Sequence, residues 1–261
     1  MRLRKKLKCV SSHAQKKNMF TLFVKEINSF LSSLIGYIVI IVFLMINSLF
    51  LWVFNSDFNI MGFGFANIDG LFLIAPFVFL FLIPAITMRS FADEKKSGTI
   101  ELLLTKPLSD LQIILAKYFA GLLLVLFSLL PTLIYFISVY WLGFPVGNMD
   151  VGATWGSYIG LLLLGAAFVA IGLFCSSLTD KQVLAFVLSV FFCGFLYIGF
   201  DFIYSLDLFG KIDLFIKSIG MNAHYISLSR GVVDTRDIIY FLSIIVLFVL
   251  LSKISIEKRK W

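Results

Sequence analysis

The chain alternates between long apolar stretches and short polar segments. Six stretches consist mainly of Leu, Ile, Val and Phe, over lengths close to the roughly 20 residues with which a helix crosses a hydrocarbon core. A soluble helix would interrupt each stretch with a polar face. We therefore expect an all-α integral membrane protein whose six transmembrane helices occupy residues 34–54, 71–88, 111–140, 155–175, 182–200 and 238–251.

Local signals refine this pattern. The third span is long enough that it should tilt or project from the bilayer. Pro131 should kink it, and Pro76 and Pro84 should do the same to the second span. Two capping boxes, Ser109 to Gln112 and Thr179 to Gln182, predict the starts of the third and fifth helices.

The region before the first span has two parts. Residues 1–18 are basic and polar and predict a cytoplasmic tail, so residues 19–261 form one membrane domain. Between Phe20 and Leu34 the apolar residues have helical spacing, with Lys25, Glu26 and serines on the other face. Such a helix is typical of the membrane interface, although a cytoplasmic extension of the first span is the alternative. Because Lys25 and Glu26 interrupt the apolar residues, we expect no cleaved signal peptide.

Composition and charge agree with this class. Hydrophobic residues make up 60% of the chain and charged residues 14%, whereas soluble domains carry about 25% charged residues. The net charge of +7 does not predict nucleic-acid binding, because the basic residues gather between the apolar stretches. With both termini inside, 18 of the 22 Lys and Arg residues are cytoplasmic, as the positive-inside rule requires. We therefore expect a multi-pass protein of a bacterial cytoplasmic membrane with both termini in the cytoplasm.

Catalytic and cofactor motifs are absent from the sequence. It contains no phosphate-binding GxxxxGK[ST] loop, no HExxH and no GxSxG, so we expect neither enzyme activity nor a directly bound cofactor. The three cysteines form no CxxC or Cys/His cluster, so we expect neither a disulfide nor a metal site. We interpret His224 as a packing or surface residue. Six glycines are interpreted as close-packing positions (Gly36, Gly121, Gly160, Gly165, Gly172 and Gly194). Four polar residues within the spans either line a path or, as is commoner, form interhelical hydrogen bonds (Asn47, Ser128, Thr132 and Ser189).

The segment between the second and third spans is distinctive. A charged cluster precedes Gly98, Thr99 can cap a short helix over residues 100–106, and Pro107 ends that helix. The short helix would present leucines beside Glu101 to the cytoplasm, which suits a groove on a partner protein. A turn that rests on lipid headgroups explains the same pattern.

The same segment resembles the signature of type-2 ABC exporter permeases, an Arg and a Glu followed by Gly-Thr and Glu-Leu-Leu. From residue 89 the chain reads Arg-Ser-Phe-Ala-Asp-Glu-Lys-Lys-Ser-Gly-Thr-Ile-Glu-Leu-Leu-Leu, with Pro-Leu-Ser after two more residues. The resemblance covers nearly all of residues 19–261 and excludes residues 1–18. Residues 25–30, 228–240 and 257–261 are also similar to gliding-motility-associated ABC transporter permeases, although permeases of other export systems share much of this pattern.

The resemblance implies a cytoplasmic coupling helix that docks on a separate ABC ATPase. It also implies a second permease chain, identical or different, and short re-entrant helices within residues 201–237. An extracytoplasmic auxiliary protein is a further partner of this class. The residues that match the coupling pattern are Glu94, Gly98, Thr99, Glu101, Leu102 and Leu103.

Two other functions are compatible with the spans. An ATP-independent channel or membrane enzyme would need paired polar residues within them, and intramembrane charge is rare here. A scaffold for other membrane proteins would need none. The sequence does not reveal the transported substrate, or whether Met19 is the true start.

Overall fold

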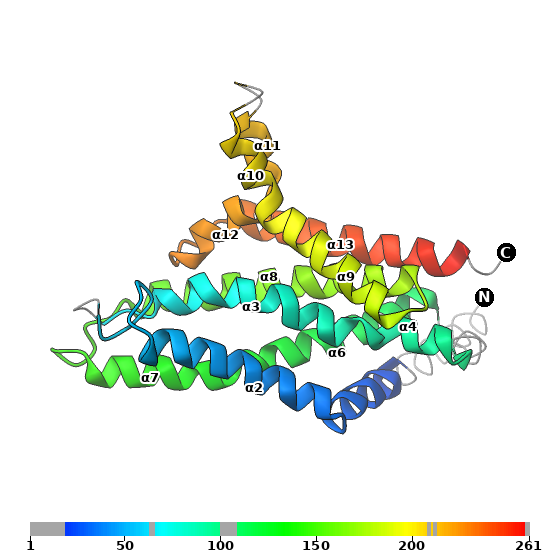
Figure 1. Ribbon diagram of the computed structural model, residues 1–261, viewed down its shortest axis with the longest axis horizontal. Helices are drawn as coiled ribbons and strands as arrows, with labels where there is room; N and C mark the ends of the chain where they lie inside the picture. The colour runs from blue at the N-terminus through cyan, green and yellow to red at the C-terminus, as the bar shows by residue number, and fades with distance from the viewer. Residues whose placement is uncertain (1–18, 63–65, 100–108, 208–209, 211–212, 259–261) are drawn as a thin grey trace, which may run out of the picture.

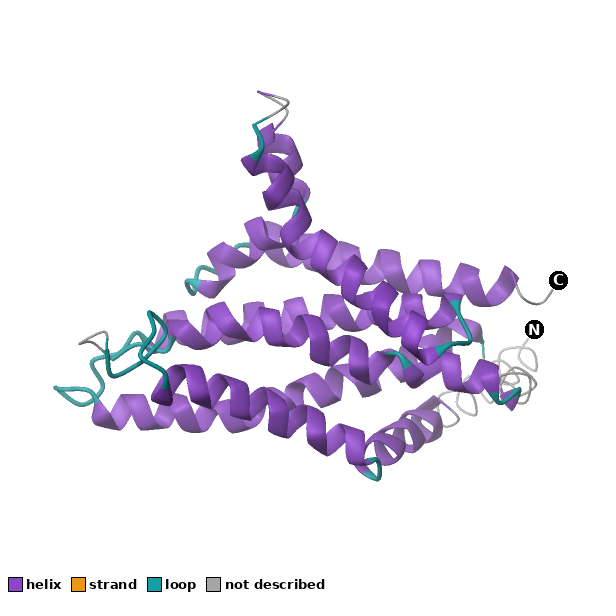
Figure 2. Ribbon diagram, in the orientation of Figure 1, coloured by secondary structure: helices purple, strands orange, loops and turns teal. Residues whose placement is uncertain are grey.

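The computed structural model describes residues 19–62, 66–99, 109–207, 210 and 213–258. All regular secondary structure in these ranges is helical (Figure 2). An N-terminal helix covers residues 19–31, and a bend at residues 32–33 separates it from the first span. The helices that follow are α2 (Leu34–Ser48), α3 (Asp69–Thr87), α4 (Arg89–Lys96), α6 (Asp110–Leu129), α7 (Leu133–Leu142), α8 (Val151–Leu178), α9 (Gln182–Gly194), α10 (Phe200–Ser205), α11 (Asp213–Ile219), α12 (Met221–Ser229) and α13 (Thr235–Glu257).

Six helical segments within the described residues are long and apolar enough to cross a membrane, which confirms the expected fold class. They cover Gly36–Val53, Asp69–Lys96, Asp110–Leu142, Val151–Leu178, Gln182–Ser205 and Thr235–Glu257. The predicted spans therefore overlap all six, and the structure extends most of them by a few residues. The extension is greatest in the second span, which runs from Asp69 through α4 to Lys96, and is nearly as large in the last span, which runs from Thr235 to Glu257.

The prolines have different effects in the two spans that contain them. Pro131 lies in a short 3-10 turn, Leu130–Thr132, which separates α6 from α7 and confirms the predicted break. In contrast, α3 continues through both Pro76 and Pro84, and its helix ends only at Thr87.

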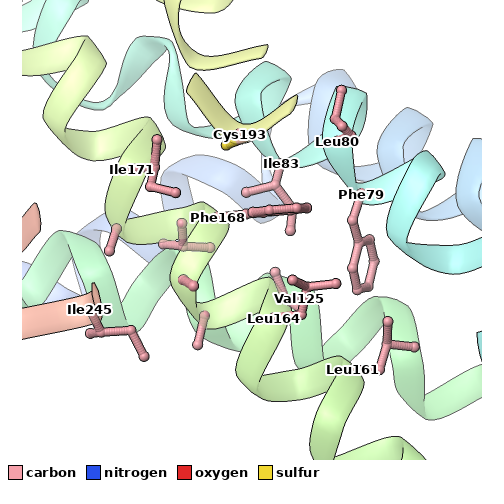
Figure 3. Close-up of a cluster of buried hydrophobic side chains, with 14 of the residues drawn as sticks. Phe79, Leu80, Ile83, Val125, Leu161, Leu164, Phe168, Ile171, Cys193 and Ile245 are labelled. Carbon is pink, nitrogen blue, oxygen red and sulfur yellow. The ribbon is translucent and has the colours of Figure 1, made fainter. Parts of the chain in front are cut away.

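Helix α8 is the central element of the bundle. It packs against α3, α6, α9, α12 and α13, and most of its side chains are buried. Figure 3 shows Leu164 and Phe168 of α8 among Phe79 and Ile83 of α3, with Val125 of α6 beside them. These side chains form the centre of the apolar core.

Small residues on α6 and α8 allow this close packing. An added Cβ would lie 2.9 Å from Val169 at Gly121, 2.5 Å from Leu228 at Gly160 and 2.0 Å from Thr87 at Gly172. These contacts confirm the packing interpretation, whereas Gly194 has only an ordinary contact at 3.6 Å.

The polar side chains within the spans mostly bond to their own helices. Asn47 donates to Phe43 O, and Ser128 donates to Val125 O. Of these four residues, Thr132 bonds to another span, since its hydroxyl lies 3.1 Å from the Tyr158 hydroxyl of α8. The expectation of interhelical bonds was therefore wrong for Asn47 and Ser128, since a carbonyl one turn back lies within reach of each side chain.

The two ends of the bundle differ (Figure 1). One end holds α4, the N-terminal helix and the end of α13. The loops that join α2 to α3 and α7 to α8 lie at the other end, and α10 and α11 project to one side. The resemblance placed short re-entrant helices within residues 201–237. The described part of that region contains the short helices α10, α11 and α12.

The close contact at Gly160 gives a test of this packing. Gly160→Ala should lower the free energy of unfolding by about 1–3 kcal/mol, because the new methyl group would push Leu228 and α12 away from α8. Thermal unfolding of the purified protein in detergent would measure it. Gly152→Ala in the exposed first turn of α8 is the matched control, since its nearest contact is at 3.4 Å. Equal stability of both variants would contradict the packing described.

Candidate functional site: a charged cluster around helix α4

Helix α4 follows α3 directly and is bound to the end of α8. The Ser176 hydroxyl accepts hydrogen bonds from the backbone N–H groups of Phe91 and Ala92, at 3.0 and 3.2 Å, and donates to Met88 O at 2.9 Å. N–H groups in the first turn of a helix have no partner within that helix. The buried Ser176 therefore holds the start of α4 in place.

The polar face of α4 is bound to its neighbours as well. Lys95 donates to Ser177 O, and the Gln182 side chain donates to the Asp93 carboxylate. The predicted capping box of the fifth span is therefore wrong. Helix α9 begins at Gln182 itself, Thr179 accepts only from Lys181 N at 3.1 Å, and the Gln182 amide bonds to α4 instead.

Lys117 is the centre of the cluster. Its side chain is only 2% exposed, and its Nζ lies 3.1 Å from Glu26 Oε1 and 2.9 Å from Glu94 Oε1. The ammonium group also lies 5.2 Å from the centre of the Phe91 ring. A buried charge costs several kcal/mol unless it is paired, so these contacts link the N-terminal helix, α4 and α6. Glu26 is thus buried, so this part of the polar face of the N-terminal helix lies against α6.

A polar cleft of about 360 Å³ opens beside this cluster. Within the described part of the chain, Glu94 Oε2 and Arg89 Nε are buried without a hydrogen-bond partner. The residues that line the cleft include three basic ones, Lys25, Arg89 and Lys117, and three acidic ones, Glu26, Asp93 and Glu94.

The predicted coupling residues divide into two groups. Glu94 belongs to the cluster, and Gly98 has a φ of 71°, a left-handed conformation that glycine adopts without strain and that ends α4 abruptly. The Thr99 hydroxyl lies 2.9 Å from the Ser97 hydroxyl. Glu101, Leu102 and Leu103 lie outside the described residues.

Sequence reasoning missed the other members of the cluster. Lys117 lies seven residues inside the predicted third span, and a charge in that position was a signal for a partner. Ser176 and Gln182 gave no comparable signal, because each looks like an ordinary polar residue near a helix end.

The cluster around α4 consists of ion pairs and hydrogen bonds between helices. Among the described residues, no three His, Cys, Asp or Glu side chains gather in a group that could hold a metal ion. No curated protein matches the chain. A family model, however, matches residues 63–256, and it describes the ABC-2 family transporter protein. The chain belongs to the ABC-2 transporter family.

Members of the ABC-2 family are the transmembrane component of an ABC transporter and are distinct from its nucleotide-binding ATPase. The match begins before α3 and ends within α13, so it covers four of the six spans completely and all but the last residue of a fifth. This ABC-2 protein is therefore a multi-pass permease component, as the resemblance implied.

The buried cluster predicts that replacing Lys117 alone destabilises the protein more than replacing it together with its two carboxylate partners. Lys117→Met should lower the free energy of unfolding by about 3–5 kcal/mol, because it leaves two buried carboxylates without their cation. Adding Glu26→Gln and Glu94→Gln should restore most of this loss, since no uncompensated charge remains. Unfolding in detergent would measure both variants, and a triple variant no more stable than Lys117→Met would contradict the pairing.

Ser176 provides an independent test of how α4 is held. Ser176→Ala should destabilise the protein by about 1–3 kcal/mol, because two backbone N–H groups lose their acceptor. Amide exchange in α4 should also accelerate. Ser177→Ala is the matched control, because this neighbour is equally buried but donates only within its own helix, to Phe174 O. Similar exchange in the two variants would rule out the role assigned to Ser176.

Proposed function

We propose that this ABC-2 permease is the transmembrane subunit of an ATP-driven exporter, and that a separate cytoplasmic ATPase docks on the segment that follows α4. The observation that carries this proposal is the Lys117 cluster, because it ties α4 to α6 and to the N-terminal helix. A docking segment is useful only if its movement reaches the spans.

The contacts of α4 provide that transmission. The helix continues from α3, bonds to α8 through Ser176 and to α9 through Gln182, and pairs with α6 through Glu94. Five elements are therefore attached to one short helix, counting the N-terminal helix. When the ATPase moves the segment after Gly98, α4 shifts these elements together and changes access between the two sides of the membrane.

The proposal also covers the subunits of the exporter and the membrane in which it lies. Two permease chains and two ATPase chains would form the exporter, in a bacterial cytoplasmic membrane. The positive-inside rule supports a cytoplasmic position for α4 and both termini. The similarity at residues 228–240 to gliding-motility permeases supports a role in gliding, as export or as force transmission. Normal gliding of cells that lack the chain would remove that assignment alone.

The docking proposal is tested at the segment itself. Glu101→Arg combined with Leu103→Asp should abolish co-purification of the ATPase and reduce transport to background, because it reverses the charge and makes the apolar side of the predicted helix polar. Pull-down from membranes, with identification of the soluble partner, would measure the first effect. Flux in reconstituted vesicles would measure the second.

A matched control changes the same chemistry at the other end of the molecule. Asp57→Arg with Met61→Asp alters an exposed acid and an exposed apolar residue in the loop between α2 and α3. This control should leave ATPase binding intact. If the Glu101 and Leu103 variant also retained ATPase binding and transport, the docking site would lie elsewhere.

A further inference from the structure

Three short helices gather at the start of α13. Helix α12 is firmly seated on the bundle, because Leu228 packs over Gly160 of α8 and the Tyr225 hydroxyl donates to Phe72 O of α3 at 2.7 Å. Burial raises the pKa of Tyr225 well above its ordinary value, so its hydroxyl stays protonated and remains a donor. Helix α11 packs on α10 and α12, and Tyr240 of α13 donates to Ile219 O at its end.

The ring of His224 on α12 joins α11 to α13. Its Nε2 lies 2.9 Å from Ser218 O, and its Nδ1 lies 2.7 Å from Asp237 Oδ1. A carbonyl oxygen can only accept, so Nε2 must carry a hydrogen. The neutral ring would then turn a lone pair toward the Asp237 carboxylate. One more proton, between Nδ1 and Oδ1, is needed to satisfy both contacts at once.

Further groups surround both members of this pair. Ser227 donates to Asp237 Oδ2, and Asp237 lies in the first turn of α13, where the helix dipole stabilises a negative charge. On the other side, Ser218 O belongs to the last turn of α11, where a cation is favoured. Tyr240 stacks on the His224 ring at 3.9 Å and donates to Ile219 O.

Among the described residues of the surrounding helices, the other charged side chains make their contacts away from the His224 ring. Asn222 donates to Asp201 of α10, and Lys217 of α11 lies over the Tyr204 ring at 4.6 Å. Helix α8 carries no acidic or basic side chain. The remaining charged residues nearby are Asp213 in α11, which is buried and has an interaction of its own, and Arg230, Asp234 and Arg236, which are exposed around the turn into α13.

We propose that His224 and Asp237 form a proton-binding site that fastens α11 to α13. With the shared proton bound, the ring bridges Ser218 O and the carboxylate. When the proton leaves, one of the two contacts becomes repulsive and α11 is released, while α12 stays on α8. The way α11 is held would therefore depend on pH in this ABC-2 permease. The site is independent of ATPase docking.

Amide hydrogen exchange of the purified full chain in lipid nanodiscs tests this proposal. After correction for the intrinsic pH dependence of exchange, protection of residues 213–219 should fall about tenfold from pH 5.5 to pH 8, the size of one charge-assisted hydrogen bond. Residues 221–229 and α8 should keep their protection. His224→Gln and Asp237→Asn should each give low protection of 213–219 at both pH values.

Two controls make the result specific. The sequence contains one other histidine, so His13→Gln should leave the pH response unchanged. Ser218→Ala should do the same, because it keeps the carbonyl that the ring contacts. Equal protection of α11 at both pH values in the wild-type chain would overturn the proposal, and so would a pH response that survives His224→Gln. Exchange in α8 reports whether each variant is folded.

Discussion

A buried ammonium group constrains the end of this molecule that holds α4. Lys117 lies inside a span, where an unpaired charge is too costly to tolerate, so carboxylates from two other elements must reach it. Glu26 comes from a helix that precedes the first span, and Glu94 comes from a helix that follows the second. If the N-terminal helix or α4 separated from α6, Lys117 and its partner carboxylate would lose their ion pair. The ion pairs thus hold α4, which leads into the segment for which we propose ATPase docking.

The two polar clusters of the molecule differ in what they hold together. The Lys117 cluster joins the N-terminal helix and α4 to α6, a span of the bundle, through one ammonium group and two carboxylates. The His224 pair joins a short helix, α11, to the start of a span. One cluster therefore suits transmission of a large force, whereas the other suits a change that a single proton can make.

The sequence predicted the spans well because their signal is strong and local. Runs of Leu, Phe and Ile leave few alternatives in a bilayer, where each backbone polar group needs a partner in its own helix. The break at Pro131 was predictable for the same reason, since proline removes one donor. Pro76 and Pro84 did not interrupt α3, so the surrounding structure decided the outcome there.

The candidate site was only partly predictable. Glu94 and Gly98 belong to a recognisable motif, and the left-handed backbone of Gly98 ends α4. The pairing of Glu26 with Lys117 joins residues 91 positions apart, and that of Gln182 with Asp93 spans 89 positions. No local pattern specifies such contacts. Gln182 looked like half of a capping box, and the same amide was close enough to α4 to bond there instead.

The turn at Gly231 determines how the region before α13 can move. With a φ of 81°, this residue lies so close to α8 that an added Cβ would be 2.2 Å from the Ala153 Cα. The backbone there has no room to slide inward, and α12 is held by α8 and α3. A displacement of α11, as in the proposed release, would therefore leave α12 seated on α8 and α3, and the packing of the central helix would not change.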